Sequence, residues 1–302
     1  MKIYSHIITA IDFTPSSRAA LRESVRLAPA LGAKITAVHI MDEFLVSELK
    51  KALSEDVFDI IAEWRERLRK FVDESDLGTA QVDVEVTAGH PFNGLVAACV
   101  RHHADLLVMG TKGSRDQPGR VGVIAAKCVR KAPVDVLLVR EDAHGANKRI
   151  VTCTDFSEHS ARAMRRAFDF ARIDNAALDC VHVYQSALAL TMDAGGLGAP
   201  IPYMPDPHEA DNWRETLAKA VEPLQKEAPS LNITPVLIER LNIREAITSH
   251  VLETGASLVV LNTRGKTGLR EMLIGTTAEN IVSHAPCSIL AVKPEVLPTD
   301  ND

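Results

Sequence analysis

The chain has 302 residues, of which 46% are hydrophobic and 25% charged, a composition typical of soluble proteins with apolar cores. Its formal net charge is −6 and no basic stripe stands out, which argues against a nucleic-acid partner. No apolar run approaches the roughly 18 residues that a membrane helix needs, and no signal peptide precedes the first strand. We therefore expect a cytoplasmic protein of two domains with no membrane partner.

The first half alternates short apolar strands with amphipathic helices. After a β-rich run at 6–11, the spacing of apolar residues predicts helices over 16–31, 57–72 and 95–101, and strands over 82–86 and 106–109. The last of these strands is a continuous apolar run, as in a central parallel strand. This alternation predicts βαβ units and a parallel, doubly wound α/β sheet.

The second half repeats the first. The run 6–14, which ends in Asp12-Phe13-Thr14, returns as 149–157, which ends in Asp155-Phe156-Ser157. Further matches are 36–40 with 178–183, 104–110 with 256–262, and Ala132-Pro133 with Ala285-Pro286. We predict two domains of one Rossmann-like fold, residues 1–145 and 146–302. The second copy has extra Gly- and Pro-rich sequence within 186–212, which predicts a surface loop.

The ends of the strands are the expected ligand edge, because doubly wound sheets bind ligands beyond the carboxyl ends of their strands. This rule selects Asp12, Asp155 and the loops after Met109 and Leu261. No cysteine pair or histidine cluster has metal-ligand spacing, so we expect reduced thiols and no metal site. His39 and His182 end apolar strands, and we interpret them as structural residues near the cleft.

A glycine-rich loop follows the strand at 258–261 and leads to a Gly-Thr-Thr helix start. Its polar and glycine positions include Arg264, Gly265, Lys266, Gly275, Thr276 and Thr277. Glycines let backbone N–H groups approach phosphate oxygens, and a threonine can cap the helix and donate its hydroxyl. The same residues also fit a loop that needs glycine only for its turns, with Thr276 as a plain N-cap. The residues alone leave both interpretations open.

The spacing Asn262-x-x-Gly265, nine residues and Gly275-Thr276 resembles the ATP-binding signature of the universal stress protein family. That signature is Gly-x-x-Gly, nine residues and Gly-Ser/Thr. The segments 277–281 and 285–287 resemble the family's last helix and strand, and both copies have its opening Asp motif. The resemblance therefore covers nearly the whole chain and is to the tandem type of the family.

The resemblance implies a five-stranded parallel sheet in each copy and the binding of ATP, alone or with Mg2+. It implies adenine near Asp155 and Val183, ribose beside Asn262, and phosphates at the second glycine and the Gly-Thr helix start. Asn262 departs from the family's first glycine, so its side chain would either crowd the ribose or hydrogen-bond it.

The first copy departs further from the signature. Its corresponding positions are Asp12, Ile40, Gly110, Gly113 and Gly122. The stretch before Gly122 is one residue short, Val123 stands where the hydroxyl should be, and Pro118 removes a backbone donor. We predict that the first copy binds nucleotide weakly or not at all.

The leading hypothesis is a stress-response protein that binds an adenine nucleotide mainly in its second domain, with a regulatory role. The alternatives are a slow ATPase and a scaffold that binds a protein partner and has two degenerate clefts. No Ser-His-Asp, His-Glu-x-x-His or Gly-x-Ser-x-Gly pattern is present, so we predict no catalytic residue. The resemblance further implies that the last strands, 136–139 and 288–292, pair within the chain, which would cover their exposed edges, and a homodimer is left open.

Overall fold

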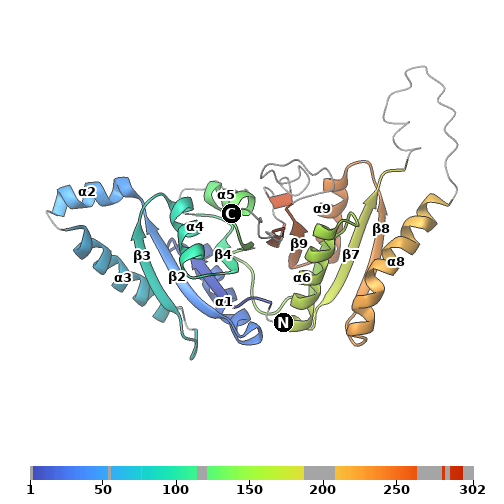
Figure 1. The fold of residues 1–302 in the computed structure, drawn as a ribbon, viewed down its shortest axis with the longest axis horizontal. Helices are drawn as coiled ribbons and strands as arrows, with labels where there is room; N and C mark the ends of the chain where they lie inside the picture. The colour runs from blue at the N-terminus through green and yellow to red at the C-terminus, as the bar shows by residue number, and fades with distance from the viewer. Residues whose placement is uncertain are drawn as a thin grey trace, which may run out of the picture. The chain divides into compact units, whose positions relative to one another are not determined.

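A computed structural model describes residues 3–53, 56–75, 77–113, 121–186, 208–263, 281–282 and 286–294. These residues form two compact units (Figure 1). Unit 1 comprises the chain up to Gly145 together with the last strand, and unit 2 begins at Ala146. The last strand, which lies within the expected second domain, thus groups with unit 1. No helix within the described ranges is long and apolar enough to cross a membrane.

Unit 1 alternates strands and helices as the periodicity predicts. Its elements are β1 (His6–Ala10), α1 (Pro15–Leu31), β2 (Lys34–Met41), α2 (Glu43–Leu53), α3 (Val57–Asp73), β3 (Asp83–Ala88), α4 (Pro91–Arg101), β4 (Leu106–Gly110), α5 (Val123–Lys131) and β5 (Asp135–Val139). The predicted helices lie within α1, α3 and α4. The helix α2 is an addition to the expected elements.

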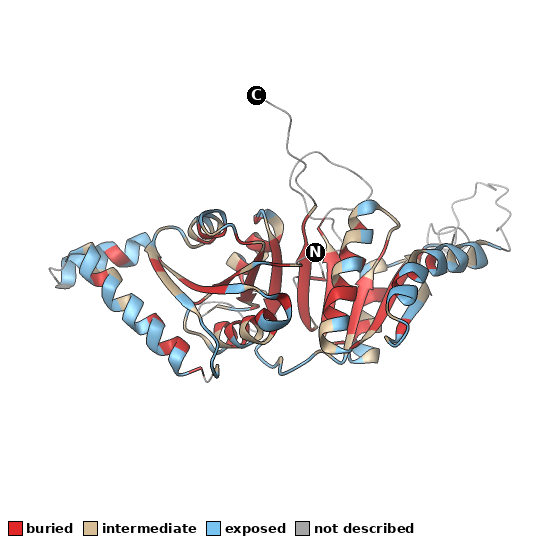
Figure 2. Ribbon diagram, turned by 60° about the horizontal axis from the view of Figure 1, so that its bottom comes forward, coloured by how far each residue is buried: buried red, intermediate tan, exposed pale blue. Residues whose placement is uncertain are grey.

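The sheet of unit 1 has the strand order β3-β2-β1-β4-β5, and these five strands are parallel. The last strand of the chain, β10 (Ser288–Val292), lies antiparallel on β5, with Leu290 opposite Leu137. The predicted α/β fold class is confirmed, as is the pairing of the two last strands. Figure 2 shows the strands mostly buried and the outer helix faces exposed.

Helices cover both faces of this sheet. Ala37 of β2 packs in one apolar cluster with Leu21 of α1 and Leu68 of α3. An ideal Cβ atom at Gly94 of α4 would lie 2.8 Å from Cδ1 of Ile40. Because side chains an odd number of residues apart on a strand point to opposite faces, α4 lies on the other face from α1 and α3. The sheet is therefore doubly wound.

Unit 2 repeats this arrangement with fewer described elements. They are β6 (Arg149–Cys153), α6 (Glu158–Asp174), β7 (Ala177–Tyr184), α8 (Glu209–Glu227), β8 (Ile233–Glu239), α9 (Ile243–Thr254) and β9 (Leu258–Asn262). The strands are parallel in the order β9-β6-β7-β8. The loop expected over 186–212 is shorter than predicted, because α8 begins at Glu209. Residues 187–207 lie outside the described residues.

The same sharp turn joins the first strand to the first helix in each unit. Phe13 and Phe156 have φ angles of 63° and 60°, in the left-handed region that non-glycine residues rarely enter. Thr14 and Ser157 then cap α1 and α6, and each side-chain oxygen accepts a backbone N–H of the first helical turn. The repeated Asp-Phe-Thr/Ser sequence thus encodes one local structure twice.

Candidate functional site

The carboxyl ends of β6, β7 and β9 meet at one edge of unit 2. The register is Cys153 opposite Val181 and Thr152 opposite Val260. The match continues beyond β6, since the Thr154 N–H donates to the Val181 carbonyl oxygen at 2.9 Å. Three predicted ligand positions, Asp155, Val183 and Asn262, therefore end neighbouring strands at this edge, and all three are half-buried.

The matching edge of unit 1 has the same register. Ala10 lies opposite Val38, and Thr9 lies opposite Val108. The predicted positions Asp12, Ile40 and Gly110 therefore meet as their counterparts do in unit 2. Asp12 is exposed, however, whereas Asp155 is half-buried. The two edges therefore have the same strand register but differ in the burial of their aspartates.

Each predicted acid holds its own turn. Oδ1 of Asp155 accepts the backbone N–H of Ser157 at 3.1 Å and its hydroxyl at 2.6 Å. Oδ1 of Asp12 accepts the same two groups of Thr14, at 3.1 and 2.6 Å. These bonds fix the capping residue in place, so each carboxylate stabilises the start of the first helix.

The strand-end histidines are anchored to the same turns, in agreement with a structural role. Nδ1 of His39 lies 2.8 Å from the Ile11 carbonyl oxygen, and Nδ1 of His182 lies 2.8 Å from that of Thr154. A carbonyl only accepts, so in each ring Nδ1 is the protonated nitrogen. Burial lowers the pKa of His39, which favours its neutral form.

A tryptophan stacks at each of these histidine sites. In unit 1 the ring of Trp64, from α3, lies parallel to that of His39, with centroids 5.1 Å apart and 6° between the planes. In unit 2 Trp213, from α8, lies 4.8 Å from His182 and is stacked on Phe156. Trp64 lies in the helix predicted over 57–72, whereas no prediction included Trp213. The available signal was one tryptophan per copy, each on the helix before the third strand.

The glycine motif of unit 1 is partly used by the fold itself. The Gly122 N–H donates to the Thr111 carbonyl oxygen at 2.8 Å, which ties the start of α5 to the end of β4. A phosphate could therefore not take this N–H without breaking that bond. Val123 follows with 72% of its surface exposed and supplies no hydroxyl. Gly113 lies in the described part of this loop and is half-buried.

Gly110 allows a close approach between β4 and α1. An ideal Cβ atom there would lie 2.8 Å from the carbonyl carbon of Ser16 and 2.4 Å from its Oγ. Asn262 occupies the matching strand position, because β4 and β9 pair in the same way with β1 and β6. Its place beside the ribose stays a prediction.

Most of the predicted phosphate loop lies outside the described residues. The predicted second-copy positions outside the described residues are Arg264, Gly265, Lys266, Gly275, Thr276 and Thr277. Within the described ranges, no three His, Cys, Asp or Glu side chains gather as a metal site would require. The structure therefore describes Asp155, Val183 and Asn262, the residues predicted to lie near adenine and ribose. The residues predicted to bind phosphate stay predictions.

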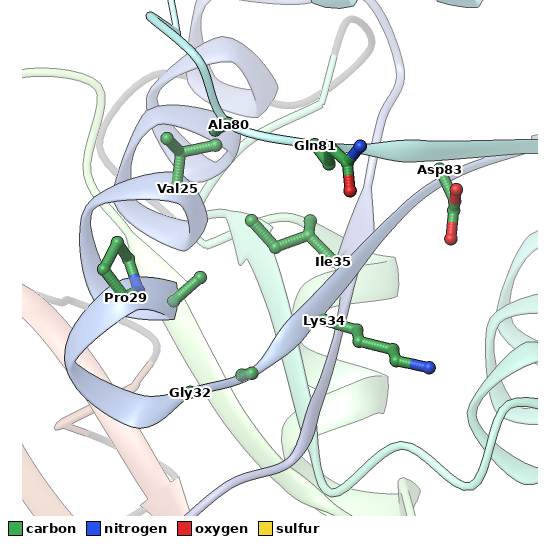
Figure 3. A pocket seen from close by; sticks show the side chains of 10 residues that line it. Val25, Pro29, Gly32, Lys34, Ile35, Ala80, Gln81 and Asp83 are labelled. Atoms are coloured by element: carbon green, nitrogen blue, oxygen red, sulfur yellow. The ribbon is translucent and has the colours of Figure 1, made fainter.

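A hollow of about 530 Å³ lies at the opposite edge of unit 1 (Figure 3). Val25 and Pro29 of α1, Ile35 of β2, and the polar residues Lys34 and Asp83 line it. Lys34 and Asp83 begin β2 and β3, so the hollow is at the amino ends of the strands. It is separate from the edge formed by Asp12, Ile40 and Gly110.

Comparisons with known proteins agree with this geometry. The universal stress protein family matches residues 3–140 and 146–293, once in each copy. The chain is 24% identical to universal stress protein Rv2623 of Mycobacterium tuberculosis over 298 residues, which cover 95% of this chain and 96% of that protein.

Two solved structures are similar to the whole chain in fold. A universal stress protein from Archaeoglobus fulgidus has a TM-score of 0.64 at 14% identity, covering 95% of this chain and 98% of that one. A putative universal stress protein from Pseudomonas aeruginosa has a TM-score of 0.65 at 17% identity, covering 97% and 94%.

Proposed function

The chain belongs to the universal stress protein family, and we propose that it binds an adenine nucleotide, ATP or a close relative, mainly in unit 2. We propose that this binding regulates a stress response and that the protein is not primarily a catalyst. The observation that supports the proposal most is the shared edge of Asp155, Val183 and Asn262, from which the glycine-rich loop continues. Parallel α/β sheets bind ligands at such an edge.

The difference between the two units supports unit 2 as the binding half. In unit 1 the Gly122 N–H is already bonded to Thr111, and the position of the motif hydroxyl is Val123. In unit 2 the sequence keeps Gly275, Thr276 and Thr277 at the matching place. Backbone N–H groups and hydroxyls at a helix start are suited to phosphate oxygens.

The bonds of the titratable groups at this edge support a regulatory role over a catalytic one. Oδ1 of Asp155 accepts two hydrogen bonds from its own turn, and Nδ1 of His182 is directed at the Thr154 carbonyl oxygen. Both groups serve the fold, whereas a general base must reach the proton it removes. Mg2+, if it accompanies ATP, would take most of its ligands from phosphate oxygens and water.

The cellular setting is part of the same proposal. All five cysteines are free thiols, which suits the reducing cytoplasm. A regulatory nucleotide-binding protein also needs a receiver, so we propose a protein partner that distinguishes the nucleotide-bound form.

Calorimetric titration of the full chain with ATP, ADP and AMP, each with Mg2+ or with EDTA, tests the proposal. We expect one strong site per chain. Gly275→Val should weaken binding at least about a hundredfold, because a side chain there blocks the approach of phosphate. Gly122→Val is the matched control in unit 1 and should leave the affinity within about threefold of the wild type.

Two results would contradict the proposal. If no adenine nucleotide binds and none is carried by the purified protein in mass spectrometry, the scaffold alternative stands. If phosphate is released from ATP in repeated turnovers that Gly275→Val abolishes, the slow-ATPase alternative stands. Loss of binding in Gly122→Val alone would move the site to unit 1.

A further inference from the structure

Two phenylalanines on the helices that follow β2 are largely exposed. Phe44 of α2 is 74% exposed and Phe58 of α3 is 80% exposed, and Leu45 beside Phe44 is 39% exposed. The other large apolar side chains exposed in the described part of the chain are single aliphatic residues on three different helices, Val100, Val123 and Leu252. Scattered aliphatic residues are ordinary on a protein surface, whereas exposed large apolar side chains concentrated in one segment indicate an interaction surface.

The core of unit 1 does not use these two phenylalanines. Val46 of α2 and Ile60 of α3 are buried, and both belong to the apolar cluster that packs α1 and α3 against β2. Each phenylalanine stands two residues before one of these buried side chains. Two residues along a helix differ in direction by about 200°, so each ring points away from the side of its helix that packs on the core. Figure 2 shows most of α2 and the outer side of α3 as exposed.

The same segment is strongly acidic. Residues 42–63 contain seven acidic residues, two lysines and no arginine, in a chain whose formal net charge is −6. Among the described residues of this segment, the ion pair found is that of Lys51 with Glu48, at 2.9 Å. The acidic side chains described there are all exposed, and they are Asp42, Glu43, Glu48, Asp56, Asp59 and Glu63. The exposed residues of 42–63, here called the α2–α3 surface, therefore combine apolar rings with an excess of carboxylates.

We propose that the α2–α3 surface binds a basic segment of a partner protein, whose apolar side chains cover Phe44 and Phe58 and whose lysines or arginines meet the carboxylates. The carboxylates repel the phosphates of nucleic acids and the headgroups of anionic membranes. A symmetric pair of two copies would bring the same acids face to face. The inference rests on the proposed function for the existence of a partner, and it places that partner on unit 1.

Fluorescence anisotropy of a labelled peptide, titrated with the full chain in the presence and absence of ATP, tests this inference. The peptide has about 18 residues of leucine and lysine, with leucine at helical spacing, and its control has glutamate in place of lysine. We expect the lysine peptide to bind with a Kd of about 10 μM or below, and the glutamate peptide to bind at least about tenfold more weakly. The double variant Phe44→Ser, Phe58→Ser should bind the lysine peptide at least about tenfold more weakly than the wild type. The matched control is Val100→Ser, Leu252→Ser, which removes exposed apolar side chains elsewhere and should stay within about threefold of the wild type.

The inference is overturned if the lysine peptide binds with a Kd above about 100 μM, if both peptides bind equally, or if the phenylalanine variant binds as the wild type does. Sedimentation velocity of the chain alone tests a second copy as the occupant. A dimer that dissociates in the phenylalanine variant would assign the surface to that copy and overturn the choice of a basic partner. Because the peptide is also titrated without ATP, its failure to bind is distinguishable from a failure of the chain to bind nucleotide.

Discussion

The imidazole of His39 lies parallel to the indole of Trp64, with their centroids 5.1 Å apart. Trp213 takes the corresponding place in unit 2, where it is stacked on Phe156 with 4° between the rings. These are the two tryptophans of the chain, and each is next to the ligand edge of its own unit. Fluorescence of the Trp213→Phe variant therefore reports unit 1, and that of Trp64→Phe reports unit 2.

The helix caps beside these edges give a matched pair of substitutions. Thr14→Ala removes the acceptor for the Ser17 N–H, and Ser157→Ala does the same for Ser160. Each also removes the hydroxyl that donates to the nearby aspartate, so each should lower the free energy of unfolding of its unit by about 1 kcal/mol. Urea unfolding of Thr14→Ala in the Trp213→Phe chain, and of Ser157→Ala in the Trp64→Phe chain, measures this.

Thr14→Ser is the control, because it keeps the capping oxygen and should stay within about 0.5 kcal/mol of the parent chain. Unchanged unfolding midpoints in both alanine variants would show that the caps do not stabilise the helix starts. Such a result would remove the reason for interpreting Asp12 and Asp155 as turn-forming residues.

The second prediction concerns Gly110, which allows β4 and α1 to pack closely. Gly110→Ala should destabilise unit 1 by about 1–3 kcal/mol, because the new Cβ atom would meet Ser16, including its backbone, at less than 3.0 Å. Urea unfolding of Gly110→Ala in the Trp213→Phe chain, followed by Trp64 emission, measures the loss. Asn262→Ala in the Trp64→Phe chain, followed by Trp213 emission, is the control, since that position already has a Cβ atom. If Gly110→Ala is as stable as its parent, the strand and α1 can separate without cost.

The repeat explains why much of the fold could be predicted. Apolar periodicity predicted α1, α3 and α4, and the resemblance to the universal stress protein family predicted the pairing of β5 with β10. Contacts between distant side chains could not be read from periodicity. The stacking of His39 on Trp64 and the approach of Ser16 to Gly110 depend on packing across elements. For the same reason, the sequence did not predict that Asp12 accepts hydrogen bonds from Thr14, because such bonds depend on the three-dimensional positions of both residues.

The stability of unit 1 should fall in acid, and His39 is one cause. Its pKa is lowered mainly by burial, against the opposing effects of the Ile11 carbonyl and the Asp12 charge, and the charge of Arg67 lowers it further. In the unfolded chain His39 takes up a proton near pH 6.5, whereas in the folded unit it stays neutral to lower pH. The unfolded state then binds more protons, so the free energy of unfolding decreases as pH falls below about 6.5.

The Trp213→Phe chain, unfolded in urea at about pH 7.5, 6.5 and 5.5, should show this decrease, with at most about 1.4 kcal/mol per pH unit from His39. His39→Asn keeps a donor for the Ile11 carbonyl oxygen and loses the titration, so its slope should be smaller. The pKa of His6 is also lowered by burial, so the slope that remains should shrink again in the variant with both histidines replaced by asparagine. Equal slopes in the parent and in His39→Asn would mean that His39 titrates alike in the folded and unfolded chain.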